Sequence, residues 1–256
     1  MKQRTALVTG GSRGIGSACA HALAAAGARV LVASRKLLDG QAVVDQIRGK
    51  GGTADAISCD VADRDSVAAM AARARDLTGG VDILVNNAGI ATSGPLHRLA
   101  LEEWNRVMQV NSTGTFLCTQ ALLAGMLERG WGRVINMASV AGMVGGGYIT
   151  AYCASKHAVL GFTRALAQEV ARRGVTVNAV CPGFVETDMT EESLDRICDK
   201  TGRTREAALA ALVAESPQGR LIQPDEVAYL VACLADELAG SINGQCIAID
   251  GGMVAR

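Results

Sequence analysis

The feature of this chain that most restricts its fold is a regular alternation between short apolar runs and longer, alanine-rich helical patterns. The strand-like runs cover residues 5–10, 29–34, 53–60, 81–89, 132–139, 175–183 and 245–252. The helical patterns cover residues 14–26, 38–50, 63–79, 100–129, 150–173 and 224–236. Because the strand-like runs are almost continuously apolar, we expect strands buried on both faces. The alternation therefore predicts an α/β fold, a doubly wound seven-stranded parallel sheet with helices on both faces.

The chain shows no linker, repeat or low-complexity tract, so it predicts a single domain spanning residues 1–256. Its 49% hydrophobic content is enough to build a sizeable core. In a doubly wound fold the ligand site lies outside the carboxyl ends of the strands. The residues that follow each strand are therefore the first candidates for function.

Charge and hydropathy exclude several classes of partner. The 25 basic and 25 acidic residues balance, and the sequence has no basic stripe of the kind that binds nucleic acid. No apolar run reaches the roughly 18 residues of a membrane span. The start, MKQRTALVTGG, enters a strand pattern at once, so we expect no signal peptide and a cytoplasmic protein. The eight cysteines are scattered and lack ligand spacing, so we expect reduced core thiols and no metal site.

A glycine-rich turn, TGGSRGIG, follows the first strand-like run. Glycines allow a tight turn and let backbone N–H groups approach a pyrophosphate at the start of the next helix. The spacing is G-x-x-x-G-x-G rather than the usual G-x-G-x-x-G, and the alternative is an ordinary strand-to-helix turn. Its place in the chain favours a dinucleotide site with these contacts: Gly10, Ser12, Arg13, Gly14, Ile15 and Gly16.

The end of the second strand-like run indicates which dinucleotide binds. An acidic residue there would hold a ribose 2′-hydroxyl, whereas this chain has Ser34 and Arg35. A hydroxyl and a guanidinium suit a 2′-phosphate. We therefore predict NADP(H) rather than NAD(H), the alternative being that these residues are solvated surface groups.

Two further strand ends belong to the predicted cofactor site. Asp60 and Val61 follow the third run, where a carboxylate can accept a hydrogen bond from an adenine amino group. The fourth run ends in NNAG, which suggests a backbone passing close to a ligand, with contacts at Asn87, Ala88 and Gly89. The alternative is that the asparagines only satisfy local backbone groups.

Six motifs together make the chain similar to the short-chain dehydrogenase/reductase family over almost its whole length. They are TGGSRGIG at 9–16, NNAG at 86–89, VNSTG with Asn111, MAS ending at Ser139, YCASK at 152–156 and CPGFVET at 181–187. Within the family, the chain most resembles 3-oxoacyl thioester reductases and aromatic-polyketide ketoreductases. The resemblance implies the doubly wound fold and a dinucleotide-dependent oxidoreductase.

The resemblance also implies a catalytic set. Tyr152 and Lys156 are spaced i, i+4 and share a helix face, so the cation is expected to lower the pKa of the phenol toward neutrality. Tyr152 is then the general acid/base, and Lys156 also holds the nicotinamide ribose. Ser139 polarises the substrate carbonyl, and Asn111 holds a water of the proton relay. The implied contacts to the nicotinamide are Pro182, Gly183, Val185 and Thr187.

The substrate is predicted from the segment 188–220, which is charged, helical and interrupts the alternation beside the site. We predict a mobile lid, the alternative being a surface helical pair. The 3-hydroxybutyrate dehydrogenases of the family use a Gln and a His where this chain has Ala91 and Ala141. A wide apolar pocket for a larger β-keto substrate is therefore favoured. Its predicted contacts are Ser139, Ala141, Val144, Tyr152 and Met189.

These features predict NADPH-dependent reduction of a β-keto group, on a 3-oxoacyl thioester or polyketide, to the β-hydroxy product. CoA or a carrier protein is a possible carrier of the substrate. Two alternatives stay open: an NAD-dependent 3-hydroxyacyl-CoA or cyclic or secondary alcohol dehydrogenase, and a catalytically silent dinucleotide-binding module. The resemblance further implies a homotetramer, in which the helices at 100–129 and 150–173 pair across a two-fold axis.

Overall fold

The computed structural model describes Met1 and residues 4–255, and residues 2, 3 and 256 of the predicted domain lie outside the described part. One seven-stranded sheet, parallel throughout, has the strand order β3-β2-β1-β4-β5-β6-β7. The strands are β1 (Thr5–Thr9), β2 (Arg29–Ser34), β3 (Thr53–Ser58), β4 (Ile83–Asn86), β5 (Gly132–Met137), β6 (Val175–Pro182) and β7 (Cys246–Ile249). The order reverses between β1 and β4, which confirms the predicted doubly wound sheet.

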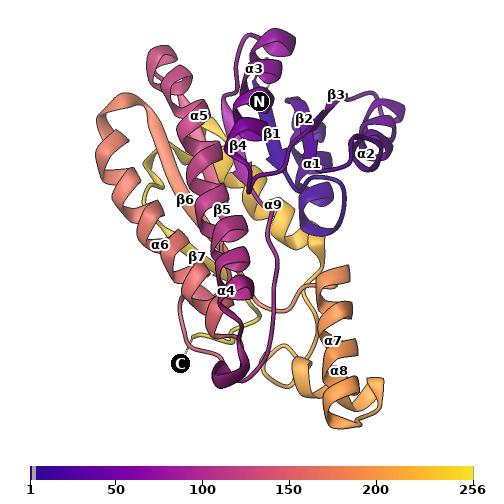
Figure 1. The fold of residues 1–256 in the computed structure, drawn as a ribbon. Helices are drawn as coiled ribbons and strands as arrows, with labels where there is room; N and C mark the ends of the chain where they lie inside the picture. Colours follow the sequence, from indigo (N-terminus) through magenta and orange to yellow (C-terminus); the bar gives the residue numbers. More distant parts are fainter. Residues whose placement is uncertain (2–3, 256) are drawn as a thin grey trace.

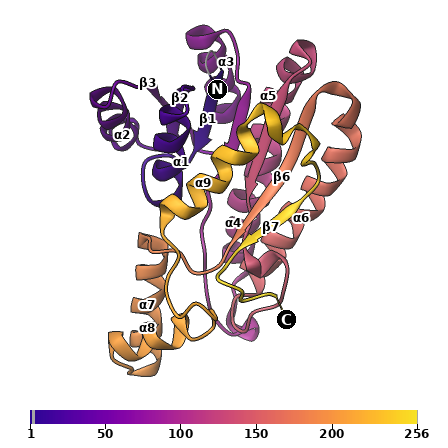
Figure 2. The same cartoon turned by 180° about the vertical axis from the view of Figure 1, so that it is seen from behind.

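Helices cover both faces of the sheet (Figures 1 and 2). One face packs against α1 (Gly14–Ala25), α2 (Leu37–Gly49) and α9 (Pro224–Ala235). The other face packs against α3 (Arg64–Thr78), α5 (Gly114–Arg129) and α6 (Thr150–Val170). The predicted strand and helix ranges agree with these elements to within a few residues, except for the helix expected at 100–129.

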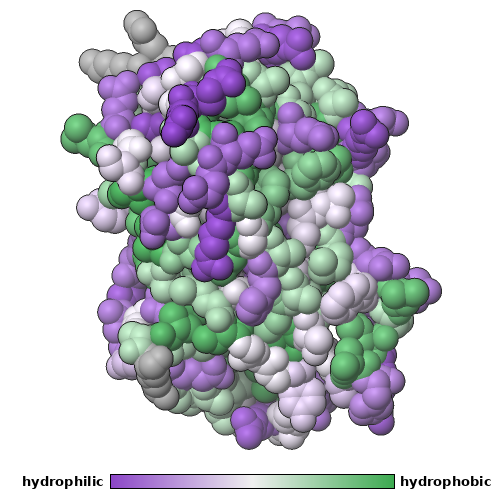
Figure 3. Space-filling model, turned by 90° about the vertical axis from the view of Figure 1, so that its left-hand side faces the viewer, coloured by the Kyte–Doolittle hydropathy of each residue, from purple (hydrophilic) through white to green (hydrophobic). Residues whose placement is uncertain are grey.

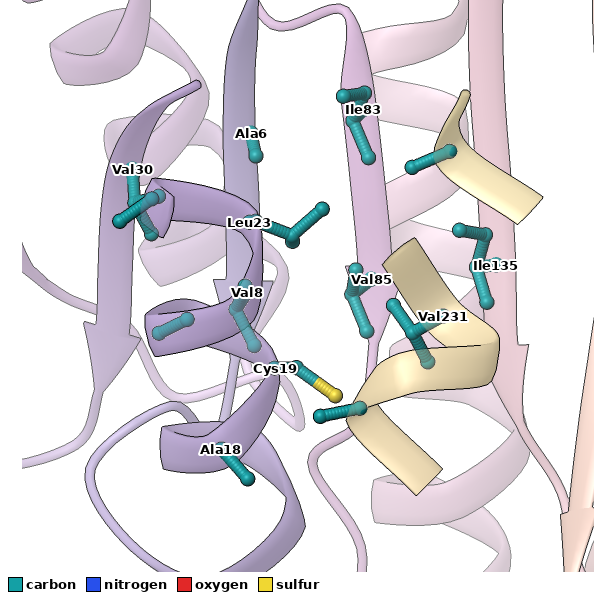
Figure 4. Close-up of a cluster of buried hydrophobic side chains, with 14 of the residues drawn as sticks. Ala6, Val8, Ala18, Cys19, Leu23, Val30, Ile83, Val85, Ile135 and Val231 are labelled. Atoms are coloured by element: carbon teal, nitrogen blue, oxygen red, sulfur yellow. The ribbon is translucent and has the colours of Figure 1, made fainter. Parts of the chain in front are cut away.

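The core explains why the strand-like runs are almost continuously apolar. Ala6 and Val8 of β1 pack under α1 and α9, while Leu7, between them, packs toward α3 and α5. In Figure 4, Leu23 of α1 and Val231 of α9 lie among side chains from the central strands. Each fully buried side chain of this size stabilises the fold by about 1.5–3 kcal/mol.

The helix expected over 100–129 is interrupted. The structure has α4 (Leu101–Met108), a π-helical turn (Gln109–Thr113) and then α5. The turn holds Asn111, whose carbonyl accepts a 2.8 Å hydrogen bond from Thr115 Oγ1. At Gly114, a Cβ would lie 2.9 Å from Val61, so the chain can approach the end of the β3 segment this closely only at a glycine. The prediction of one helix was wrong because the apolar pattern continues through the wide turn.

A buried polar network ties the central strands to α5 and α6. Asn86 Nδ2 donates to Thr119 Oγ1 and to Asn136 Oδ1, both at 2.9 Å. Asn136 Nδ2 in turn donates to Thr163 Oγ1 at 2.8 Å. The first asparagine of the NNAG motif therefore fixes how the two helices sit on the sheet. Tyr152 and Lys156 lie on α6, and Asn111 lies in the turn directly before α5.

The segment predicted as a lid forms two helices, α7 (Asp188–Thr201) and α8 (Arg205–Val213), which extend beyond the sheet (Figure 1). A small buried cluster of Leu194, Ala208 and Leu212 holds them together. Val185 and Ile222, on either side of the segment, form an isolated parallel bridge. The helical content agrees with the prediction, while its role as a lid stays a prediction.

The cysteines are free thiols throughout the described residues. Five of them are buried, Cys198 and Cys246 are partly exposed, and Cys233 is exposed. The expectation that all are core residues was therefore wrong for Cys233, which lies on the outer face of α9. No helix in the described part of the chain is long and apolar enough to cross a bilayer.

Candidate active site

The glycine turn after β1 adopts a conformation that needs its glycines. Gly10 and Gly14 have φ values of +61° and +52°, which disfavour a side chain. A Cβ on Gly16 would lie 2.2 Å from the carbonyl oxygen of Gly10. Within the described residues, α1 begins at Gly14 with no side-chain cap and no acid in its first turn. Its first N–H groups, including those of Ile15, are therefore available to an anion.

Asn87 braces this turn from the neighbouring strand. Its Nδ2 donates to Thr9 O at 3.0 Å and to Gly10 O at 3.1 Å, and its own N–H donates to Thr9 Oγ1. Ala88 lies directly against Gly10, where a Cβ would be 3.0 Å from its Cα. The structure therefore brings the NNAG motif to the glycine turn, and it uses the Asn87 amide to hold the turn.

The groups predicted to hold a 2′-phosphate, a hydroxyl and nearby cations, differ in their environment. Ser34 is 6% exposed, and its hydroxyl donates to Lys36 O at 2.8 Å, so the hydroxyl is already used. Arg35 and Lys36 are exposed beyond it. Arg13 forms a 3.1 Å ion pair with Asp188, the first residue of α7. Sequence reasoning missed Asp188 because nothing in the sequence places it beside the glycine turn.

The adenine-side residues follow β3. Asp60 is exposed, and its Oδ1 accepts a 3.0 Å hydrogen bond from Ala62 N. Val61 is buried against Gly114. Cys59 N donates to Ser34 O, so the chain leaves β3 alongside the end of β2. Asp60 and Arg35 consequently share one edge of the sheet.

Tyr152 and Lys156 lie one turn apart on α6, as predicted. Lys156 is 4% exposed, its Nζ donates to Met137 O at 2.7 Å, and Nζ lies 5.6 Å from the centre of the Tyr152 ring. Ser139, two residues after β5, is also buried, and its Oγ accepts a 3.1 Å hydrogen bond from Ala141 N. The strand and the helix thus place a hydroxyl, a phenol and an ammonium in one cluster.

The electrostatics of this cluster differ from the sequence expectation. Burial raises the pKa of the Tyr152 phenol, and the hydrogen bond with Ser139 lowers it by less. Burial also lowers the pKa of the Lys156 ammonium to about 8. The Tyr152 pKa is therefore shifted in the direction opposite to the predicted fall, because removal from water is the largest cause. A phenol with a raised pKa is protonated at neutral pH.

Asn111 is 1% exposed and holds the segment after NNAG. Its Oδ1 accepts from Ile90 N and its Nδ2 donates to Ile90 O, both at 2.9 Å, while Nδ2 also donates to Ser155 Oγ. A Cβ on Gly89 would lie 3.3 Å from Asn111 Oδ1 and 3.6 Å from Lys156 Nζ. The structure therefore brings Asn111 and Lys156 together around Gly89. The predicted water of the relay stays a prediction.

The turn after β6 closes the site between the glycine turn and the end of β7. Gly183 N donates to Ile249 O at 3.0 Å, and a Cβ on Gly183 would lie 3.2 Å from Asp250. The methyl group of Thr187 packs on Gly14, where a Cβ would be 3.2 Å away. Val185 is buried, and its carbonyl accepts from Thr190 Oγ1 at 2.6 Å. The predicted nicotinamide contacts, which include Pro182 at the end of β6, thus adjoin the predicted phosphate turn.

The predicted substrate contacts lie on a more open surface. Ala141 is buried, whereas Val144 and Met189 are 45% and 37% exposed. Tyr148 has a φ of +64°, which marks a strained turn in the loop that follows Ser139. Among the described residues, no group of three His, Cys, Asp or Glu side chains is placed to hold a metal ion.

Comparison with known proteins identifies the family. The family model described as short chain dehydrogenase matches residues 4–197. The chain is 45% identical over 253 residues to the 3-oxoacyl-[acyl-carrier-protein] reductase of Synechocystis sp., covering 98% of this chain and 97% of that one. It is 42% identical over 255 residues to the 3-oxoacyl-[acyl-carrier-protein] reductase of Vibrio cholerae, covering 99% and 98%.

A solved structure agrees with these matches. A single-residue variant of the actinorhodin polyketide ketoreductase, crystallised with NADPH, superposes with a TM-score of 0.95 at 41% identity, covering 99% of each chain. The predicted family and fold are therefore confirmed. This chain belongs to the short-chain dehydrogenase family and is an oxidoreductase of the kind that includes the 3-oxoacyl reductases.

Proposed function

We propose that this protein reduces the β-keto group of a 3-oxoacyl thioester or a related polyketide to a β-hydroxy group, with NADP(H) as cofactor. The observation that supports this most directly is the cluster of buried Ser139 and Lys156 with the half-buried Tyr152. The names of the relatives support the substrate class, since two of them are 3-oxoacyl-[acyl-carrier-protein] reductases. A carrier-bound substrate is therefore part of the proposal.

The residues present fit a dinucleotide. The uncapped start of α1 offers backbone donors to a pyrophosphate, and Gly10, Gly14 and Gly16 have no Cβ to obstruct one. Arg35 and Lys36 lie exposed at the end of β2, and Arg13 provides a guanidinium in the glycine turn, where it pairs with Asp188. These three cations favour NADP(H), and they do so without the Ser34 hydroxyl. A bound NADPH would supply the hydride that reaches the carbonyl carbon.

The chain's own groups complete the reaction. Ser139 donates a hydrogen bond to the carbonyl oxygen, which stabilises the negative charge that develops there. Tyr152 is protonated at neutral pH, as an ordinary phenol is, and burial raises its pKa further. It gives its proton to the same oxygen. Lys156 then faces a phenolate, and it is best able to stabilise that anion while it is itself protonated. Because its pKa lies near 8, we expect reduction to slow above that pH.

The test of this function is NADPH oxidation with acetoacetyl-CoA, with NADH and a bicyclic ketone such as a decalone measured in parallel. Turnover of the thioester with NADPH is the expected result. Turnover of the decalone alone would favour a cyclic substrate. Absence of turnover with both ketones, while NADPH binds, would favour the catalytically silent module.

The cofactor preference has its own test. Replacing Arg35→Asp should weaken NADPH binding about 100-fold, because it removes a phosphate contact and adds a repelling charge. Binding of NADH, which has no 2′-phosphate, should change by less than threefold. Equal losses for the two cofactors would contradict the assignment of Arg35 to the phosphate.

We also propose that the protein is a homotetramer that pairs through α5 and α6. A hollow of ≈ 270 Å³ between these helices is lined by Ser112, Thr113, Thr115, Phe116, Ala158, Val159 and Phe162. Figure 3 views the side of the molecule on which α5 and α6 lie, where hydrophobic surface runs between hydrophilic residues. Phe116 is 42% exposed there, which a second copy would cover. Light scattering at micromolar concentration tests this, and a monomer would refute it.

A further inference from the structure

A second hollow lies on the substrate side of the site. Its volume is ≈ 450 Å³, and it is lined by Val144, Ala214, Glu215, Met253 and Val254. These residues come from three segments: the loop after Ser139, the end of α8, and the turn after β7. The hollow therefore lies where the proposed lid meets the body of the protein. Its volume is within the roughly 300–1,000 Å³ of small-molecule sites.

The walls of the hollow are connected to the proposed catalytic residues. Val144 N donates to Val140 O at 2.9 Å, and Gly142 N donates to Ser139 O at 2.9 Å, so Val144 and Ser139 belong to one compact turn. On the opposite wall, the Asp250 carboxylate accepts from the N–H groups of Gly252 and Val254 at 2.9 and 2.8 Å.

The opposite wall is also joined to the turn after β6 and to the lid. A Cβ on Gly183 would lie 3.2 Å from Asp250, which places the wall beside a predicted nicotinamide contact. Ser216 Oγ donates to Asp250 O at 3.2 Å and fixes the wall to the end of the lid segment. The hollow consequently adjoins the place where a substrate carbonyl would meet Ser139 and Tyr152.

The lining of the hollow is mostly apolar and includes one carboxylate. Four of the five lining residues are apolar, and Glu215 is the one ionisable residue among them in the described part of the chain. An apolar lining suits a hydrocarbon chain, whereas a pantetheine arm has amides that would need hydrogen-bond partners. A carboxylate at the edge of such a hollow repels a second negative charge.

We propose that this hollow receives the hydrocarbon tail of the β-keto substrate, on the side of the keto group away from the thioester. We further propose that Glu215 selects against substrates whose tail ends in a carboxylate. This inference rests on the proposed β-keto reductase activity and names its substrate class as acyl chains with an uncharged tail. Glu215 acts on specificity and takes no part in the proton or hydride transfer.

The experiment compares two substrates of nearly the same size, ethyl 3-oxohexanoate and the 1-ethyl ester of 3-oxoadipic acid. Only the second has a carboxylate at the end of its tail. With NADPH, the wild-type protein should show kcat/KM about tenfold higher for the uncharged ester at low salt. Salt at about 0.5 M should reduce this preference, because the carboxylate is near solvent. In Glu215→Gln, kcat/KM for the charged ester should rise to within about threefold of the uncharged one.

Two variants make the result specific. Glu206→Gln removes an exposed carboxylate in the first turn of α8, away from the hollow, and should leave the preference unchanged. Ala214→Trp should fill the hollow and lower kcat/KM for ethyl 3-oxohexanoate about tenfold, while ethyl acetoacetate, which has a shorter tail, changes by less than twofold.

The outcomes separate the two proposals. If the wild-type protein reduces neither the uncharged esters nor acetoacetyl-CoA, the proposed function has failed. If it reduces both six-carbon esters equally, or if Glu215→Gln keeps the wild-type preference, the role of Glu215 is overturned while the reductase stands. If Ala214→Trp lowers kcat/KM equally for all three esters, the substrate tail does not bind in this hollow.

Discussion

At the carboxyl edge of the sheet, the cofactor side is packed more tightly than the substrate side. On the cofactor side, a single added methyl group at Gly16 would come within 2.2 Å of a backbone oxygen. On the substrate side, α7 and α8 are held by a buried cluster of three residues, and Met189 is 37% exposed. A phosphate-binding backbone must be fixed, whereas a surface that selects the substrate can change without disturbing the core. The catalytic cluster lies between the two.

The largest expected effect is at the boundary between the two sides. Tyr152→Phe should lower kcat about 10³-fold, because it removes the proton donor while keeping an aromatic ring at this position of α6. NADPH affinity, measured by fluorescence titration, should stay within threefold of wild type. A parallel loss of cofactor binding would mean that Tyr152 has a structural role on the cofactor side.

The tight fit on the cofactor side is tested by Gly16→Ala. We expect NADPH affinity to fall about 100-fold and stability to fall by about 2–3 kcal/mol, because the turn must shift to admit the methyl group. Gly49→Ala is the matched control, since that glycine is the last residue of α2, has open space around it and lies outside the proposed α5/α6 interface. The control should keep the wild-type NADPH affinity and stay within about 0.5 kcal/mol of wild-type stability. Unchanged cofactor binding in Gly16→Ala would remove the contrast between the two sides.

Lys156→Met should increase stability at neutral pH by about 2 kcal/mol, although it abolishes activity. The folded protein lowers the pKa of Lys156 from 10.5 to about 8, so the buried charge costs stability below pH 8. That cost fades as the pH rises from 8 to 10.5, and above 10.5 the lysine is neutral in both states. The hydrogen bond to Met137 O, which the variant lacks, offsets part of the gain.

Urea unfolding of Lys156→Met and wild type at pH 7 and pH 10 provides the measurement. The stability difference should be large at pH 7 and small at pH 10. A variant that is less stable than wild type at pH 7 would show that the contact with Met137 outweighs the cost of burying the ammonium.

A smaller effect is expected on the substrate side. Leu194→Ala should loosen α7 and α8, because Leu194 is fully buried in the cluster that joins them. We expect KM for the ketone to rise about tenfold and amide hydrogens in 188–213 to exchange faster. Exchange in β1 and β4 should be unchanged. Faster exchange throughout the sheet would mean that the two sides unfold as one unit.

The smallest effect is expected at the ion pair that links the two sides. Arg13 and Asp188 are both mostly exposed, so their ion pair contributes at most about 1 kcal/mol. Asp188→Ala frees Arg13 and should tighten NADPH binding two- to threefold at low salt, with no change for NADH. An equal change for both cofactors would show that Asp188 acts through the position of α7 instead of through Arg13.

The structure shows local hydrogen bonds and burial that the sequence did not reveal. Ser34 and Asn87 were predicted as cofactor contacts from their residue types, yet both side chains donate to nearby backbone carbonyls. A short polar side chain at a strand end can bond either to a ligand or to its own turn, and sequence does not distinguish the two. The pKa of Tyr152 was expected to fall because spacing shows a neighbouring cation and does not show burial.

The sequence by itself determined the succession of strands and helices along the chain, the parallel sheet and the positions of the glycines. These follow from local patterns, because a strand buried on both faces and a turn without room for a Cβ each restrict the residues that can occupy them. It also placed Tyr152 and Lys156 on one helix face.

Only the tertiary structure decided the contacts between distant segments. It joined Arg13 to Asp188, placed Asn111 in a π-helical turn near Lys156, and brought Glu215 to the hollow beside Val144. Such contacts depend on how the packed layers approach one another, which no local pattern encodes.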